Sequence, residues 1–454
     1  MVVVGAGIAG LCAARGLATA GRSVVVLEAR DRVGGRTLNM QLGEGRISET
    51  GGQWVGPTQD RVLALIGELG LETFPTYHEG RNLLELAGKR KRYRGTIPRL
   101  SPLVLLDLDR GRRRLARLAR TVPPEAPWTA PDAAELDATT VATWLGRAVR
   151  TRRARSLFEL AVGTAFGVRP EQMSLLWMLH LVNSCGGFDA MIDTEGGAQQ
   201  DRVVGGSQAI SETIADELGD SSVVLSAPVE RLEQDPDGVR ALAAGVSVSA
   251  RRAIVAMPPA LTTRIRFSPS LPSQRDQLAQ WMASGALTKC TAVYERPFWR
   301  DDGWSGAAVS DVGPVETTFD NSPADAGDPD SGAPGVMLGF IAGPEAAEHA
   351  RRPESERRRI VLDCFARMWG EQALGATAYF EQAWSEEEWS GGGPVCHAPP
   401  GTITAYGQEL RRPSGRVHWA GAETATVWCG YMDGAVRSGD RAAAEVLDAE
   451  GWRL

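Results

Sequence analysis

The stretch VVVGAGIAG, residues 2–10, decides the fold of this chain. Its three leading valines predict a buried β-strand, and Gly5, Gly7 and Gly10 follow in the spacing GxGxxG. Gly5 permits a tight turn, Gly7 lets bare backbone approach a pyrophosphate, and Gly10 lets the next helix sit close to the strand. Free amides at the start of that helix attract phosphate. The stretch therefore predicts a dinucleotide site in a parallel α/β layer.

The residues that follow complete a βαβ unit. Leu11, Ala14 and Leu17 recur at helical spacing, and an apolar run over residues 23–27 ends on Glu28. A carboxylate at the end of the second strand can accept hydrogen bonds from ribose hydroxyls. A lone GxGxxG is weak evidence, but strand, glycines, helix, strand and acid in this order make the prediction specific.

A second glycine pair, Gly34 and Gly35, lies in ARDRVGGRT with Arg36 beside it. The planar guanidinium of arginine can donate hydrogen bonds to phosphate and carbonyl oxygens. Nicotinamide-binding units do not need this pair, which resembles the extension that flavin enzymes use to hold FAD.

Composition sets wider limits. The chain has 454 residues, so we expect two or more lobes, and its net charge of −7 gives no case for nucleic acid as the main partner. No apolar run is long enough to span a membrane, so we expect no transmembrane helix and a soluble protein. The cysteines form no CxxC pair, so we expect a reducing, cytoplasmic setting. The six cysteines and five histidines are dispersed, and we expect neither a disulfide framework nor a metal site.

Two basic clusters stand out, GKRKRYRG at residues 88–95 and DRGRRRLARLAR at residues 109–120. Leu115 and Leu118 lie among the arginines of the second cluster at helical spacing. We expect a solvated helix face there, with a membrane surface or an anionic partner as the alternative.

Five segments together resemble the flavin monoamine oxidase family, nearly from end to end. They are VVVGAGIAGLCAARGL…VVVLEARDRVGGRT from residue 2, GGQWVGPTQDR at 51–61, GGAQQDRVVGGSQ at 196–208, LTKCTAVYERPFWR at 287–300 and WAGAETATVWCGYMDGAVRSGDRAA at 419–443. The resemblance implies an α/β, two-lobe FAD-dependent amine oxidase fold, with a Rossmann-like FAD-binding domain and an α+β substrate-binding domain. It also implies oxidative deamination of a primary or secondary amine, by hydride transfer to flavin N5, with the imine hydrolysed and O2 reduced to hydrogen peroxide.

The expected domains are discontinuous. Residues 1–75, 204–280 and 387–454 form the FAD-binding domain, and residues 76–203 and 281–386 the substrate-binding domain. Within residues 204–280, Ile210, Ile214 and Leu218 share one helical face, and Gly219 ends the helix.

The resemblance assigns residues to FAD and to catalysis. The expected cofactor-binding residues are Gly5, Gly7, Ala9, Gly10, Glu28, Ala29, Arg30, Gly34, Gly35, Arg36, Gly52, Gln53, Trp54, Val229, Trp384, Gly421, Glu423, Thr424, Tyr431 and Met432. Among them, Glu423 and Thr424 would meet the phosphate and ribityl part. A helix from about Asp433 would direct its N-terminus at reduced flavin. The expected catalytic residues are Lys289, which would hold a water against flavin N5, and Tyr431, one ring of an aromatic pair around the amine.

The expected substrate pocket consists mostly of apolar positions: Leu160, Ala161, Met191, Ile192, Gln199, Val309, Phe340 and Pro394. Such a lining favours a monoamine. Gln53 and Trp54 replace the stretch usual in amino-acid oxidases, which weighs against α-amino acids. A polyamine or diamine oxidase needs acidic groups in its tunnel; Glu316 and Asp320 lie in a plausible loop, but surface solvation explains them more simply. Thr317 stands near a bulky tyrosine of mammalian relatives and suggests a wider cavity, for a larger substrate.

Other possibilities stay open. The chain could bind FAD without catalysis, or act as a flavin desaturase or isomerase on a larger amine; Lys289 together with Tyr431 favours an oxidase. The expected partners are the amine and O2, with no nucleic acid and no membrane, and a homodimer is possible.

The stretch WSGGGPVCHAPPG, residues 389–401, bears on how FAD is held. In covalent members of the family a cysteine follows the Ser-Gly-Gly element, but here Gly393 does, and Cys396 comes three residues later. Three extended residues displace a thiol by up to about 10 Å, so we expect noncovalent FAD. The next position, an aromatic wall of the amine slot in the family, is Pro394, so the second ring is missing unless His397 or Trp428 supplies it.

Overall fold

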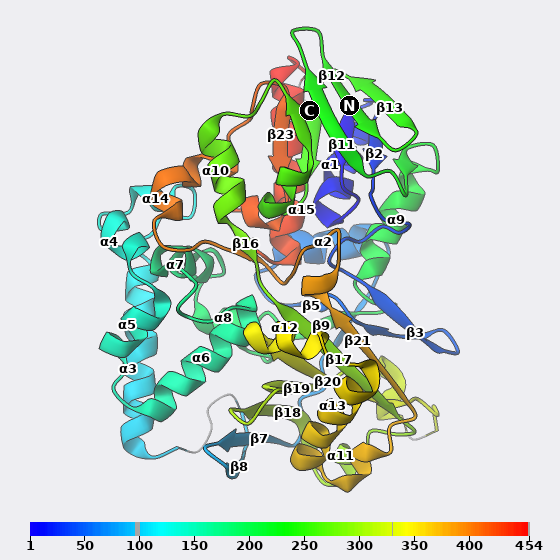
Figure 1. Cartoon of the computed structure of the whole chain (residues 1–454). Helices are drawn as coiled ribbons and strands as arrows, with labels where there is room; N and C mark the ends of the chain where they lie inside the picture. The colour runs from blue at the N-terminus through cyan, green and yellow to red at the C-terminus, as the bar shows by residue number, and fades with distance from the viewer. Residues whose placement is uncertain (96–99, 329, 453–454) are drawn as a thin grey trace.

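Five short parallel strands form the sheet that carries the N-terminal motif, in the order β10–β2–β1–β14–β23. Their bounds are β1 Val2–Val4, β2 Val25–Leu27, β10 Val223–Val224, β14 Ala253–Ala256 and β23 Val417–Ala420. The computed structural model describes residues 1–95, 100–328 and 330–452. Strands from three distant stretches are thus neighbours in one sheet, at the top of Figure 1.

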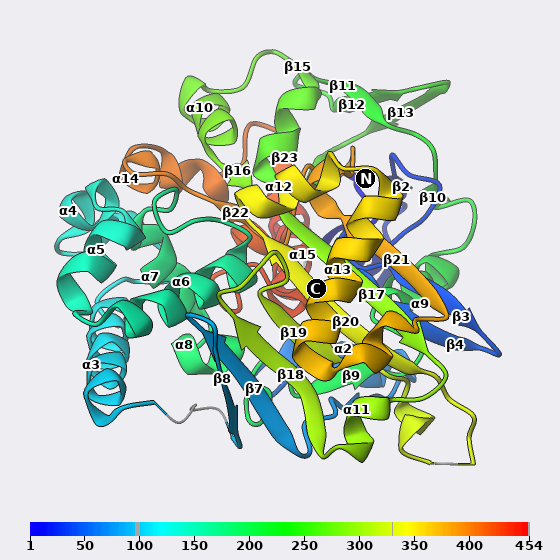
Figure 2. The ribbon, with the colours of Figure 1, turned by 60° about the horizontal axis from the view of Figure 1, so that its bottom comes forward.

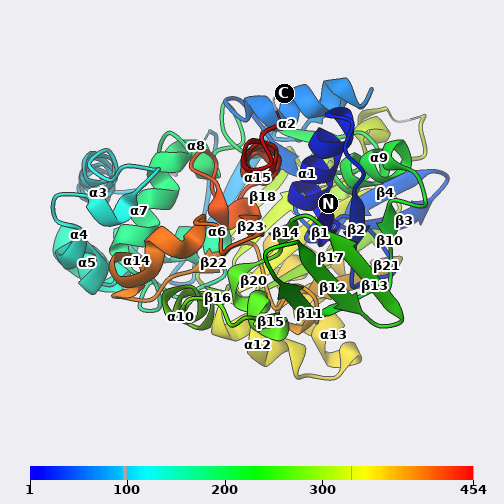
Figure 3. The same cartoon turned by 90° about the horizontal axis from the view of Figure 1, so that it is seen from above.

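Two helices lie together against this sheet, α1 (Ile8–Thr19) and α15 (Met432–Ala449), although they begin and end the chain. Figure 3 shows them side by side. The approach of the two helices depends on glycine, because a Cβ on Gly439 of α15 would lie 2.3 Å from the carbonyl oxygen of Ala9 in α1. Gly10 serves the approach of α1 to the turn after β1, because a Cβ there would lie 1.9 Å from the carbonyl oxygen of Gly5. The predicted helix with a Gly219 cap is confirmed as α9 (Gln208–Leu218).

A mixed four-stranded sheet, in which only β11 and β15 pair in parallel, covers the outer side of this lobe. Its strands follow the order β13–β12–β11–β15, with bounds β11 Val229–Gln234, β12 Val239–Ala243, β13 Val246–Ala250 and β15 Arg266–Ser268. Leu232 and Ala241 of this layer share one buried cluster with Val4 and Val255 of the parallel sheet.

The second lobe contains a seven-stranded sheet, in the order β21–β17–β20–β19–β18–β7–β8. The bounds are β7 Arg81–Leu86, β8 Lys89–Tyr93, β17 Leu287–Tyr294, β18 Trp304–Ser310, β19 Thr317–Asp320, β20 Gly335–Ala342 and β21 Ala378–Ala383. Figure 2 shows α13 (Glu354–Trp369) lying across one face. Its Phe365 and Trp369 join a core with Cys290 and Met337 of the sheet.

A group of helices forms the remaining side of the molecule, at the left of Figure 1. It comprises α3 Pro102–Ala119, α4 Ala133–Ala138, α5 Val141–Ala148, α6 Arg152–Phe166, α7 Leu175–Ser184 and α8 Phe188–Ile192. Helix α7 is apolar around nearly its whole circumference and is almost entirely buried. In the described parts of the chain, no helix is both long and apolar enough to cross a bilayer.

A small sheet, β5–β9–β6, joins the lobes. Its outer strands, β5 (Trp54–Val55) and β6 (Thr73–Pro75), flank β9 (Asp201–Val203). We propose that the chain divides near residues 75, 203, 280 and 386, with this sheet spanning the division.

Substitution of Gly10 tests the close contact between strand and helix. Gly10→Ala places a methyl group against the Gly5 carbonyl, so we expect a loss of about 1–3 kcal/mol in the free energy of unfolding. Gly7→Ala is the matched control, because its added Cβ meets only the Cα of Gly35, at 3.8 Å. Thermal unfolding of the flavin-free proteins measures both, and equal melting temperatures would contradict the argument.

Candidate active site

One large cavity of about 660 Å³ runs from the glycine motif into the second lobe. Its walls come from the parallel sheet, the seven-stranded sheet, α6 and α8, and the segment after β21. Residues of both lobes and of the helical group therefore line the same cavity.

The N-terminal glycines form one end of the cavity. Gly5 has a φ of +100°, as a turn directly after a strand requires. A Cβ on Gly35 would lie 3.2 Å from the Cα of Gly7, so the two glycine segments approach as bare backbone. The Glu28 carboxylate accepts hydrogen bonds from the backbone N–H groups of Ala6, at 2.7 Å, and Arg30, at 3.0 Å, and keeps acceptor capacity toward the cavity.

Nearly all residues assigned to FAD line this cavity. They are Gly5, Gly7, Ala9, Glu28, Ala29, Arg30, Gly34, Gly35, Arg36, Gly52, Gln53, Trp54, Val229, Trp384, Gly421, Tyr431 and Met432. Gly10, Glu423 and Thr424 do not line it. The position of Gly10 agrees with its predicted packing role. Glu423 and Thr424 are buried beside the cavity, and their contact with FAD stays a prediction.

Glu423 is fully buried, and its carboxylate accepts two hydrogen bonds from Arg36. Arg36 donates through Nη1 to Oε1, at 2.6 Å, and through Nη2 to Oε2, at 3.0 Å. Arg36 also donates to the carbonyl oxygen of Pro394, at 2.7 Å, and Glu423 accepts from the backbone N–H of Cys396, at 3.1 Å. Thr424 accepts from Arg441. These contacts fasten the C-terminal segment to the glycine loop and build the cavity wall from behind.

Lys289 enters the cavity from β17 and is only 2% exposed. Its Nζ donates to the carbonyl oxygen of Gly51, at 2.9 Å, and to Oε1 of Gln53. Burial lowers the pKa of Lys289 to about 7, because a desolvated ammonium is costly. Its amine therefore changes protonation state near neutral pH.

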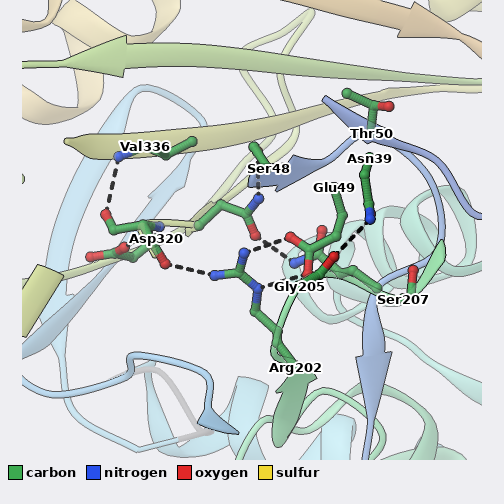
Figure 4. A network of polar contacts seen from close by, with 12 residues as sticks. Asn39, Ser48, Glu49, Thr50, Arg202, Gly205, Ser207, Asp320 and Val336 are labelled. Atoms are coloured by element: carbon green, nitrogen blue, oxygen red, sulfur yellow. Dashed lines mark hydrogen bonds and ion pairs between the residues drawn. The ribbon is translucent and has the colours of Figure 1, made fainter. Parts of the chain in front are cut away.

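A polar network supports this lysine. Gln53 donates to Asn321, at 2.6 Å, and Asn321 donates to Ser48, at 2.9 Å. Figure 4 shows Arg202 beside it, forming a buried ion pair with Glu49 at 2.5 Å. The amide of Gln53 is thus occupied by protein partners.

Tyr431 and Pro394 both line the cavity, but neither of the two rings considered as a partner for Tyr431 in the aromatic pair does so. Trp428 meets Tyr431 edge-on, with ring centroids 5.0 Å apart, and donates to the carbonyl oxygen of Thr58. Neither Trp428 nor His397 lines the cavity, so neither takes the missing place. The Tyr431 hydroxyl donates to the carbonyl oxygen of Met191, at 3.1 Å, which holds the ring against the substrate wall.

All eight residues assigned to the substrate pocket line the same cavity: Leu160, Ala161, Met191, Ile192, Gln199, Val309, Phe340 and Pro394. Thr317 lines it too, paired with Phe340 across two strands, and its buried hydroxyl has no hydrogen-bond partner among the described residues. Thr164, which was not predicted from the sequence, also lines the cavity, one helical turn beyond Leu160; helical spacing was the available signal.

The expected solvation of Glu316 and Asp320 is wrong. Asp320 is buried and accepts from Trp299 Nε1, at 2.8 Å, and from Arg300 Nε, at 2.7 Å. Burial raises the pKa of Glu316 to about 7, and its Oε2 has no partner in the described structure. Glu316 itself does not line the cavity.

Three acidic residues absent from the sequence prediction line the cavity, Asp189, Glu195 and Asp193, and of these only Asp193 is partly buried. It follows Ile192, lines the cavity, and its carboxylate accepts no hydrogen bond from the described residues. Partial burial, with Asp189 nearby, raises the pKa of Asp193 to about 6. Its place directly after an assigned pocket residue was the only signal in the sequence.

The thiol of Cys396 is buried outside the cavity, within 3.5 Å of the Ser284 hydroxyl. Gly393 instead lies on the cavity wall, beside Trp384. Cys429 reaches the cavity, but its Sγ donates to the carbonyl oxygen of Glu423.

Among the described residues, folding brings together one group of side chains of the kinds that bind metals, Cys290, His349 and Glu381, which lie outside the cavity. Glu381 pairs with His349, at 2.9 Å, and with Arg357, at 2.7 Å. These partners already satisfy the carboxylate.

The residues present fit a bound FAD. Two bare glycine segments offer backbone amides, Glu28 offers carboxylate oxygens, and the indole N–H of Trp54 is buried with no partner among the described residues. The glycine segments suit the pyrophosphate, Glu28 suits the adenosine ribose, and Trp54 suits the isoalloxazine.

Comparison with known proteins agrees with this geometry. Residues 8–447 match the family model described as flavin containing amine oxidoreductase. A Mycobacterium tuberculosis protein named AofH, assigned as a flavin-containing monoamine oxidase, is 45% identical over 446 residues, covering 98% of this chain and 96% of its own. Flavin-containing amine oxidase B of Sus scrofa is 39% identical over 456 residues, covering 99% and 86%.

Two solved structures share the whole fold. Putrescine oxidase bound to putrescine superposes with a TM-score of 0.92 at 35% identity, covering 98% of both chains. Cyclohexylamine oxidase from Brevibacterium oxydans superposes with a TM-score of 0.93 at 35% identity, covering 99% of both. The expected two-lobe fold is thereby confirmed.

The buried amine of Lys289 predicts a pH dependence of stability. The native state releases its proton near pH 7, whereas an unfolded lysine keeps it up to about pH 10.4. The unfolded state binds more protons in this window, so stability rises with pH, by up to about 1.4 kcal/mol per pH unit.

Denaturant unfolding of the flavin-free protein between these pH values measures the effect. Lys289→Met should remove this rise, and Lys89→Met, an exposed lysine, is the matched control. Parallel stability profiles for wild type and Lys289→Met would contradict the argument.

Proposed function

Because the chain belongs to the family of flavin-containing amine oxidoreductases, we propose that its cavity takes an amine with an apolar side group. The protein is an FAD-dependent amine oxidase, and its reaction is the oxidative deamination of an amine. The observation that carries the proposal is the meeting of Lys289, Tyr431 and an apolar substrate wall in one cavity with the glycine cradle.

Bound FAD would supply the redox chemistry, as the hydride acceptor for the amine α-carbon and the electron donor to O2, so that the products are an imine, which water hydrolyses, and hydrogen peroxide. Arg30, Arg36 and the two glycine segments would hold its phosphates and sugar. The hydrogen bonds of Lys289 to Gly51 and Gln53 would direct its amine at a water beside the reacting face. With a pKa near 7, this amine can hold or pass a proton there.

The remaining residues would bind and orient the amine. Tyr431 and Pro394 both line the cavity, and together they would leave the amine slot with one aromatic side. Leu160, Met191 and Phe340 exclude water, which favours the neutral amine that can release hydride. Cyclohexylamine oxidase, a structural neighbour, is named for a substrate with an apolar ring.

A second candidate is an amine with another cationic group, and Asp193 favours it. Its free carboxylate could meet a distal ammonium, and another structural neighbour is putrescine oxidase bound to putrescine, a diamine. The same carboxylate would repel an α-amino acid. We also propose, from the resemblance alone, that O2 is the physiological acceptor and that the protein forms a homodimer in the cytoplasm.

An anaerobic panel of amines tests the function. We expect benzylamine or cyclohexylamine to bleach the flavin, and peroxide to appear after air is admitted. No bleaching by any amine would instead support a catalytically silent protein or a desaturase.

Two amines of equal length separate the candidates, pentylamine and 1,5-diaminopentane. If Asp193 meets a distal ammonium, Asp193→Asn should lower kcat/KM for the diamine by about tenfold or more and spare pentylamine, since a charged hydrogen bond contributes about 1.5–3 kcal/mol. Asp189→Asn, which alters a neighbouring carboxylate that already pairs with Arg112, is the matched control. An unchanged ratio would leave the monoamine as the substrate.

The FAD of this protein is held noncovalently, with glycine at the wall position beside Trp384 and the Cys396 thiol turned away. Acid precipitation should therefore release the yellow colour into the supernatant. Colour retained in the pellet would show a covalent bond, and Cys429→Ser would then identify the one cavity-lining thiol of the described residues as its source.

A further inference from the structure

Helix α3 presents an outward stripe of two leucines followed by arginines. Its members recur at steps of three and four residues and are all exposed: Leu103, Leu106, Arg110, Arg113, Arg117 and Arg120. Leu103 is 75% exposed and Leu106 67%, which makes them the two most exposed large apolar side chains of the described residues. Figure 1 shows α3 on the outer rim of the helical group.

The opposite side of α3 is locked in place. Leu115 is fully buried, and a Cβ on Gly111 would lie 2.9 Å from Phe158 and from Val149. Asp107 accepts hydrogen bonds from the backbone N–H groups at the start of α6, including that of Thr151 at 2.6 Å. The helix cannot rotate to bury its leucines, so the stripe is a permanent surface.

The stripe is also the outer part of a strongly basic region. Residues 89–120 contain twelve Arg or Lys and two Asp, a formal charge of +10 on a chain whose total is −7. The side chains of Arg110, Arg117 and Arg120 form no hydrogen bond or ion pair with any described residue; Arg113 pairs with Asp109 one turn back. These arginines are free to meet an external anion.

We propose that the outer face of α3 adsorbs on an anionic lipid bilayer, with its arginines at the headgroups and Leu103 and Leu106 among the acyl chains. A merely solvated face explains the arginines but not two leucines on the same stripe. An acidic polypeptide would attract the arginines, whereas a bilayer surface accepts both kinds of side chain. Such adsorption needs no spanning helix.

The adsorbed face borders the cavity. Leu108 and Arg112 of α3 line the cavity, and so do the exposed residues Gly95 and Asp189. Arg112 and Asp189 form an ion pair at this point. The cavity therefore reaches the surface beside α3, and adsorption would hold this opening near the lipid.

Vesicle co-sedimentation of the FAD-loaded protein tests the proposal. We expect binding to vesicles that contain phosphatidylglycerol, little binding to phosphatidylcholine alone, and weaker binding as salt is added. Arg110→Gln with Arg117→Gln should lower vesicle affinity about tenfold or more, because each arginine near such a surface contributes about 1 kcal/mol. Leu103→Ser with Leu106→Ser should also weaken binding.

Arg266→Gln with Arg351→Gln is the matched control, since both arginines are exposed, lie outside α3 and have side chains that form no hydrogen bond or ion pair among the described residues. Flavin absorbance and turnover of a water-soluble amine report that each variant is folded. Equal binding to both vesicle types, or an equal loss in the control, would overturn the proposal. Binding to polyglutamate but not to vesicles would overturn it in favour of an acidic polypeptide.

Discussion

The ion pair between Arg36 and Glu423 holds the cavity in shape. A buried carboxylate is costly to desolvate, and the two-fold contact with one guanidinium offsets that cost. The pair joins residues 387 positions apart in sequence, and its bonds to Pro394 and Cys396 attach a third segment. Removal of one partner from such a pair typically costs about 3–5 kcal/mol. The cradle for FAD and the wall of the amine slot both depend on it.

A second buried charge lies deeper, and the same physics gives it another role. Lys289 has carbonyl and amide oxygens as partners and no carboxylate within bonding reach, so burial shifts its pKa toward neutrality. Arg202 and Glu49, which lie behind it, neutralise each other instead. The protein thus keeps one titratable amine in the cavity and satisfies the surrounding charges in pairs.

Some parts of the fold and site could be predicted because they are local. The motif at residues 2–10 specifies its own strand, turn and helix. Gly219 marks the end of its helix because glycine adopts a positive φ without strain. The role of Glu423 could not be predicted, because its partner Arg36 lies in a distant segment. Glu316 and Asp320 were misjudged for the same reason, since an acidic loop looks solvated until the packing around it is known. Asp193 belongs to no sequence motif that would have predicted its place in the cavity.

The sequence by itself determined the dinucleotide motif, the family, the cofactor and the absence of a cysteine at the tether position, because each rests on short spacings or on a chain-wide resemblance. Only the tertiary structure decided which polar groups are free in the cavity: Asp193 is available, whereas Glu423 and Gln53 are occupied. It also turned the arginines and leucines of α3 outward. Burial and hydrogen-bond partners depend on contacts between distant segments, and these exist only once the chain has folded.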